Sequence, residues 1–141
     1  MLFYQILIPY ISNLNLPIAD TPKKLIVTLK GELKNSMEFV EGLYILESDK
    51  INGKPCWIQD KAYWLEKRGM AIWYEKEGGF ENWNIGDIDD LGSSTVIMYS
   101  SSSLGPHTSN TWNYFKNYDS DDDTRFETTD VLISPGPGIL H

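Results

Sequence analysis

Residues 42–60, GLYILESDKINGKPCWIQD, contain the clearest fold signal in this chain of 141 residues. Two short runs of β-branched and aromatic residues flank Asn52-Gly53, and both of these turn residues tolerate the positive φ angles of a type I′ turn. Because proline has no N–H to donate, Pro55 must lie at a sheet edge or a bulge. The stretch therefore predicts a β-hairpin.

Short apolar runs of the same kind recur along the chain, each bounded by Gly, Pro, Asn, Asp or Ser. They lie at residues 25–29, 42–46, 56–58, 70–74, 83–85, 95–99, 112–115 and 131–133. Such runs are typical of strands. The best helical window, Leu33 to Val40, is about two turns long. Asp60–Arg68 is interpreted as strand or irregular, although Asp60 and Gly69 could also bound a helix. The sequence predicts an all-β fold, a compact antiparallel barrel or sandwich of about eight to ten short strands.

Residues 69–87, GMAIWYEKEGGFENWNIGD, share a pattern with residues 42–60. Each stretch opens with Gly and carries a Trp near its end, Trp57 in one and Trp83 in the other, one position out of step. A third copy over residues 95–115 would carry Trp112. This spacing predicts three hairpin pseudo-repeats whose return strands send these tryptophans into one shared core. The alternative is that any all-β chain forms hairpins at such intervals.

The chain divides into a single β domain over residues 23–133, a preceding segment 1–22 and a Pro/Gly tail 134–141. The first eleven residues form a largely apolar run that contains Gln5, and Ala19 is small, as in a secretory signal peptide. The run has no preceding Lys or Arg and is interrupted by Pro9, so a packed N-terminal strand or arm is the other interpretation. The tail resembles a linker, which is compatible with a larger chain or assembly. A secreted or cell-surface location is favoured.

The negative charge is concentrated in the second part of the chain. The net charge is −8 at pH 7, with 10 Lys/Arg against 9 Asp/Glu up to residue 76 and 2 against 11 beyond it. Nucleic-acid binding needs a basic surface, and no apolar run reaches the roughly 18 residues of a membrane helix. We therefore expect no nucleic-acid partner and no membrane span, while a cationic partner or a metal ion stays open.

An acidic run near the C-terminal end offers a candidate metal site. Asp119, Asp121 and Asp123 are alternate carboxylates that could converge on Ca²⁺ in a curled loop. The EF-hand pattern fails, because Thr124 stands where that loop has Gly and Asp130 stands where it has Glu. A solvated acidic loop is the alternative. No cofactor other than such a Ca²⁺ ion is expected.

Catalytic motifs are weak. His107, in a turn-like stretch, is the one plausible general base for a small hydrolase, and no Gly-x-Ser-x-Gly elbow accompanies it. Cys56 lies in a predicted strand and is expected to be a buried small hydrophobe. The carboxylates at 87, 89 and 90 form a second, looser acidic group.

The aromatic content is high, with 5 Trp and 8 Tyr. Adjacent strand residues point to opposite faces, so Trp73 and Tyr74 cannot both lie inside one sheet face, and Tyr63 and Trp64 pose the same problem. One member of each pair is expected to be exposed unless packed elements cover both faces. Exposed rings suit a sugar or a protein partner. The candidate ligand-binding residues are Trp64, Trp73 and Tyr74.

One ordered string of residues resembles small β modules found in large, often extracellular or multidomain eukaryotic proteins, modules that mostly have no assigned function. It comprises Gly42-x-Tyr44, residues 52–57 (Asn-Gly-x-Pro-x-Trp), Trp83-x-Ile85-Gly86, Gly105-Pro106 and Trp112. The resemblance implies a fold unit over residues 24–133 and carries over no functional residue.

Taken together, these features favour a non-enzymatic recognition or assembly module that binds a protein partner or a glycan through exposed aromatic residues. Two alternatives remain: a Ca²⁺-dependent binding module using the 119–123 loop, and a small hydrolase centred on His107.

Overall fold

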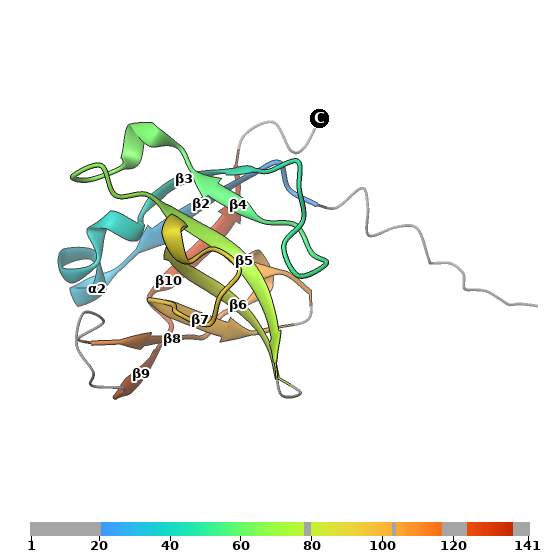
Figure 1. Ribbon diagram of the computed structural model, residues 1–141. Helices are drawn as coiled ribbons and strands as arrows, with labels where there is room; N and C mark the ends of the chain where they lie inside the picture. The colour runs from blue at the N-terminus through green and yellow to red at the C-terminus, as the bar shows by residue number, and fades with distance from the viewer. Residues whose placement is uncertain (1–20, 78–79, 103, 117–123, 137–141) are drawn as a thin grey trace, which may run out of the picture.

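The computed structural model describes residues 21–77, 80–102, 104–116 and 124–136. In this part of the chain, nine antiparallel strands form one sheet that curves into a nearly closed barrel, accompanied by one short helix (Figure 1). The strands are β2 (Lys24–Leu29), β3 (Gly42–Leu46), β4 (Trp57–Gln59), β5 (Met70–Glu77), β6 (Phe80–Asp87), β7 (Met98–Ser101), β8 (Trp112–Phe115), β9 (Arg125–Thr128) and β10 (Val131–Pro135). The predicted all-β antiparallel fold is confirmed, and the barrel replaces the sandwich alternative.

The strand order explains how the barrel closes. Each strand from β2 to β8 pairs with the next along the chain, and β10 returns to pair with β2, where Val131 lies opposite Leu29. The two edges of the sheet are therefore β9 and β10, which are consecutive in the chain and joined by residues 129–130. The seam of the barrel lies between them.

Three consecutive hairpins build most of the wall: β3–β4, β5–β6 and β7–β8. As expected, their tryptophans Trp57, Trp83 and Trp112 are buried in one core, and the rings of Trp57 and Trp83 lie 5.9 Å apart. The turn between β3 and β4 also follows the sequence prediction, because Asn52 and Gly53 have φ angles of 55° and 83°. Positive φ at both central residues is the requirement of a type I′ turn.

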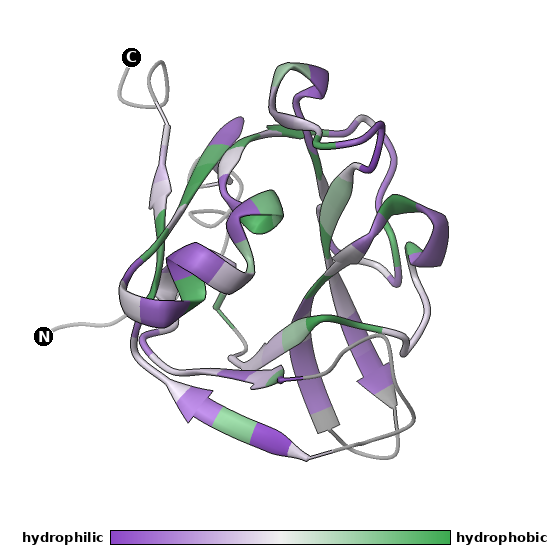
Figure 2. Cartoon of the chain, turned by 90° about the vertical axis from the view of Figure 1, so that its left-hand side faces the viewer, coloured by the Kyte–Doolittle hydropathy of each residue, from purple (hydrophilic) through white to green (hydrophobic). Residues whose placement is uncertain are grey.

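The helical segments are short and lie outside the strands. The window from Leu33 to Val40 forms α2 (Gly31–Ser36) and the 3₁₀ turn η1 (Glu38–Val40), which bury Leu33, Met37 and Val40 against the barrel core. Three further 3₁₀ turns are η2 (Lys61–Tyr63), η3 (Ile88–Asp90) and η4 (Pro106–Thr108). Seen from the side of α2, the strands run around a central interior (Figure 2). Buried apolar side chains form the core there.

The segment from Asp60 to Arg68 is irregular rather than a strand. The Asp60 carboxylate accepts a hydrogen bond from the Ala62 backbone N–H (3.1 Å) and so caps η2. A tight turn follows, in which Leu65 pairs with Arg68. Of the two alternatives for this segment, the irregular one is confirmed. No helix among the described residues is long and apolar enough to span a membrane.

The wall of the barrel is covered on part of its outer side. Outward-facing Cys56, Ala71 and Trp73 are buried, and partly buried apolar side chains from residues 51–58 and 88–96 pack over them. We call this region the covered face. Strand β5 is therefore buried on both sides, because its alternate residues Met70, Ile72 and Tyr74 belong to the barrel interior.

Candidate functional site

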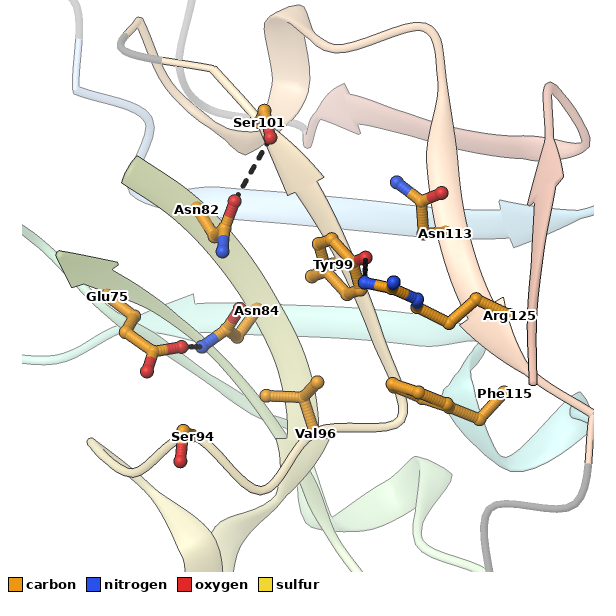
Figure 3. A pocket seen from close by; sticks show the side chains of 10 residues that line it. All are labelled: Glu75, Asn82, Asn84, Ser94, Val96, Tyr99, Ser101, Asn113, Phe115 and Arg125. Atoms are coloured by element: carbon orange, nitrogen blue, oxygen red, sulfur yellow. Dashed lines mark hydrogen bonds between the residues drawn. The ribbon is translucent and has the colours of Figure 1, made fainter. Parts of the chain in front are cut away.

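Beside the covered face, the outer wall carries an open polar depression of about 540 Å³. This volume lies within the roughly 300–1,000 Å³ typical of small-ligand sites. We call it the outer-face site. Its lining residues come from strands β5 to β9 and from the segment before β7 (Figure 3): Glu75, Asn82, Asn84, Ser94, Val96, Tyr99, Ser101, Asn113, Phe115 and Arg125.

Strand register brings the central residues of this site into one row. Asn84 on β6 lies opposite Tyr99 on β7, and Tyr99 lies opposite Asn113 on β8. Directly opposed residues on adjacent strands share a face and are near neighbours. Because their sequence neighbours Trp83, Ile85, Met98 and Trp112 point into the core, these polar side chains must point outward.

Hydrogen bonds hold several of these side chains in place. Asn84 Nδ2 donates to Glu75 Oε1 (2.9 Å), and Ser101 Oγ donates to Asn82 Oδ1 (3.1 Å). On the opposite side, Arg125 Nη1 donates to the Tyr99 hydroxyl oxygen (2.7 Å) (Figure 3). The site is therefore ordered before any ligand enters, which lowers the entropic cost of binding.

Asn84 has an unused hydrogen-bonding atom at the floor of the site. Its side chain is only 1% exposed, and its Oδ1 is buried without a hydrogen-bond partner among the described residues. Buried polar atoms nearly always have a partner, so each exception needs an explanation. A hydroxyl group or water entering the outer-face site would supply the missing donor after a small rearrangement of the amide.

Two aromatic rings lie beside the polar row. The rings of Tyr99 and Phe115 have centroids 6.3 Å apart with an interplanar angle of 42°. Arg125 is exposed and forms no ion pair with a described carboxylate, whereas Glu75 is half-buried on the far side of the site. The site thus offers donors, acceptors and an apolar surface within one depression.

The predicted ligand-binding residues Trp73 and Tyr74 lie elsewhere, and of the two alternatives for this pair the burial of both rings between packed elements holds. Trp73 is 0% exposed on the covered face, where its Nε1 donates to the Ser93 carbonyl oxygen (3.0 Å). Tyr74 is 3% exposed in the barrel interior, with its ring 5.4 Å from that of Trp83. Tyr74 is buried by the barrel core, and Trp73 is buried because the 88–96 segment covers the other face of the strand.

Trp64 occupies a separate small groove of about 240 Å³ with Arg68 and Asp87, which form an ion pair there (3.2 Å). The Trp64 ring is half-buried and its Nε1 donates to the Gln59 carbonyl oxygen (2.9 Å). Its neighbour Tyr63 is the exposed member of the pair, at 47%. The structure does not place Trp64 in the outer-face site, and its role in ligand binding stays a prediction.

The candidate metal ligands Asp119, Asp121 and Asp123 lie outside the described residues. In the part of the chain that the structure covers, no group of three His, Cys, Asp or Glu side chains could hold a metal ion. In the second acidic group, Asp87 is engaged by Arg68 and by the Asp89 backbone N–H, which donates to Asp87 Oδ1 (2.9 Å).

The structure also describes the surroundings of Cys56 and His107. Cys56 is buried as expected, and burial together with Glu47 and Asp49 raises the pKa of its thiol. His107 lies in η4, where its Nδ1 is buried without a hydrogen-bond partner among the described residues, and burial lowers the pKa of the imidazole. A general base normally has a group that orients its second nitrogen, so this setting lends no support to the hydrolase interpretation.

The outer-face site was not predicted from the sequence, because polar alternation along the strands marks it and an aromatic cluster does not. The signal was nevertheless available. Asn82 and Asn84 alternate with Trp83 and Ile85, and the outward positions 99, 101, 113 and 115 alternate with core positions in the same way. Comparisons with protein-family models, with curated proteins and with solved structures found no match.

Proposed function

We propose that this protein is a non-enzymatic glycan-binding module whose ligand occupies the outer-face site. A sugar ring presents hydroxyl groups that both donate and accept hydrogen bonds, and C–H faces that pack on aromatic rings. The outer-face site matches both features: amides and a carboxylate accept, amides and a guanidinium donate, and Tyr99 and Phe115 supply ring surface.

The observation that carries the proposal is the row from Asn84 to Asn113. In this row, the side-chain oxygen of Asn84 is buried and accepts no hydrogen bond from a described residue. The side-chain amide of Asn113 forms no hydrogen bond to another described residue. The unpartnered oxygen of Asn84 and both amide atoms of Asn113 therefore belong to residues that line one depression. A protein partner of ordinary size would need a larger apolar centre than this polar site provides.

The number of carboxylates in the site supports sugar binding rather than sugar hydrolysis. Glycoside hydrolysis normally uses a pair of carboxylates that flank the scissile bond. Among the described lining residues Glu75 is the one carboxylate, and its Oε1 already accepts from Asn84.

The test is a glycan array followed by titration calorimetry with the sugars that the array returns. Asn113→Ala is expected to weaken binding about tenfold or more, because it removes a central amide, while the free energy of unfolding changes by less than about 0.5 kcal/mol. Asn35→Ala, which removes an exposed amide from α2, is the matched control and should leave binding unchanged. An array that returns no glycan, or equal affinities for the two variants, would show that the proposal is wrong.

A further inference from the structure

A second polar depression of about 420 Å³ adjoins the outer-face site and shares two lining residues with it, Ser101 and Asn113. Its other lining residues include Ser102, Ser109, Thr111 and Glu127. We call it the hydroxyl subsite. The shared residues lie on neighbouring strands β7 and β8, so the two depressions form one continuous groove across the outer wall.

The hydroxyl subsite is also ordered by its own hydrogen bonds. Ser109 Oγ donates to the Thr111 carbonyl oxygen (3.2 Å), and the hydroxyl oxygens of Ser102 and Thr108 are 3.2 Å apart. The Thr108 hydroxyl also donates to the Gly105 carbonyl oxygen (2.8 Å). These bonds hold Ser102, Thr108 and Ser109 in place, so that their hydroxyl groups form a stable wall of the groove.

The dimensions of the groove exceed a single sugar. On the β8 side, Phe115 lines the outer-face site, Asn113 lines both depressions and Thr111 lines the hydroxyl subsite. Three residues lie between Thr111 and Phe115, so these two residues are four steps of extended chain apart, which at about 3.3 Å per step is about 13 Å. One pyranose ring would leave most of this length unoccupied.

We infer that the ligand is a neutral linear oligosaccharide of at least two sugars that spans both depressions, an inference that rests on the proposed function. One sugar packs on Tyr99 and Phe115, and the next binds the hydroxyl and amide groups of the hydroxyl subsite. The described groove carries one cation, Arg125, against Glu75 and Glu127. The chain as a whole has a net charge of −8, which repels a polyanionic glycan.

The experiment measures affinity against chain length. The probes are linear gluco-, xylo- and manno-oligosaccharides of one to six sugars, with oligogalacturonates of the same lengths as charged counterparts. In the series that binds, affinity should rise about tenfold between one sugar and two or three and then level off. Oligogalacturonates should bind more weakly than their neutral counterparts.

Two variants test whether the rise in affinity with chain length comes from the hydroxyl subsite. Asn110→Ala and Glu127→Gln alter exposed residues that line this subsite and not the outer-face site. They should abolish most of the length-dependent gain and leave monosaccharide binding unchanged, whereas Asn35→Ala should change neither.

Equal affinity for all chain lengths, or tighter binding of the oligogalacturonates, would overturn this inference and leave the glycan-binding function standing. Absence of binding by every sugar, including those of the array, would overturn the proposed function itself.

Discussion

Over β4 to β6 the outer wall of the barrel is apolar and covered by loops, whereas over β6 to β9 it is polar and open. In the covered face, Trp73 is buried beneath the 88–96 segment. In the outer-face site, Tyr99 and Phe115 stand among amides and hydroxyl groups. Val96 takes part in both, since it packs against the covered face and lines the site. An outward aromatic residue is therefore structural where a loop covers it and available for contact where polar neighbours surround it.

The largest effect is expected at the covered face. Trp73→Ala removes a fully buried indole and its hydrogen bond to the Ser93 carbonyl oxygen, and should lower the free energy of unfolding by about 3–5 kcal/mol. Urea denaturation followed by circular dichroism measures this loss. The control Tyr63→Ala truncates an exposed aromatic side chain and should cost much less. Similar costs for the two variants would mean that the 88–96 segment does not cover Trp73 in solution.

A smaller effect is expected where the backbone makes room for that indole. A Cβ atom at Gly86 would lie 2.8 Å from Cη2 of Trp73. Gly86→Ala should therefore cost about 1–3 kcal/mol through overpacking, again measured by urea denaturation. In a Trp73→Ala background the same substitution should cost clearly less, because the clashing ring is absent. Additive costs in the double variant would show that the two residues do not contact each other.

The parts of the molecule that could be predicted from the sequence are those that neighbouring residues in the chain determine. The turn at Asn52-Gly53 was predictable because its backbone angles depend on the two residues themselves. The inward positions of Trp57, Trp83 and Trp112 followed from alternation along single strands. The choice between a barrel and a sandwich could not be made from the sequence. Barrel closure depends on the pairing of Val131 with Leu29, which lie near opposite ends of the chain.

The choice between the two alternatives for Trp73 and Tyr74, one ring exposed or both buried, was open for the same reason. Alternation correctly places their side chains on opposite faces of β5, but it does not show which face a distant segment covers. The outer-face site was missed for a related reason. Its central row unites Asn84, Tyr99 and Asn113, which come from three strands and become neighbours through strand register alone.

A still smaller effect on stability is expected in the open region, at the hydroxyl of Tyr99. This oxygen accepts a hydrogen bond from Arg125 Nη1 (2.7 Å), and both residues line the outer-face site. Tyr99→Phe keeps the ring and should lower the free energy of unfolding by no more than about 1 kcal/mol, because water can replace the lost bond at the surface. Sugar affinity should nevertheless fall about three- to tenfold, since the variant loses a polar contact and releases the guanidinium from its position.

The matched control for Tyr99→Phe is Tyr63→Phe, which removes the same hydroxyl from an exposed tyrosine outside the site. Calorimetry with the array-derived sugar and urea denaturation should be run on both variants. A loss of several kcal/mol in Tyr99→Phe would place Tyr99 with Trp73 as a structural residue, because a merely positioning hydroxyl cannot contribute that much. A loss of sugar affinity without such a loss of stability would distinguish the two regions. Substitution in the open part of the wall would then change binding, and substitution in the covered part would change the free energy of unfolding.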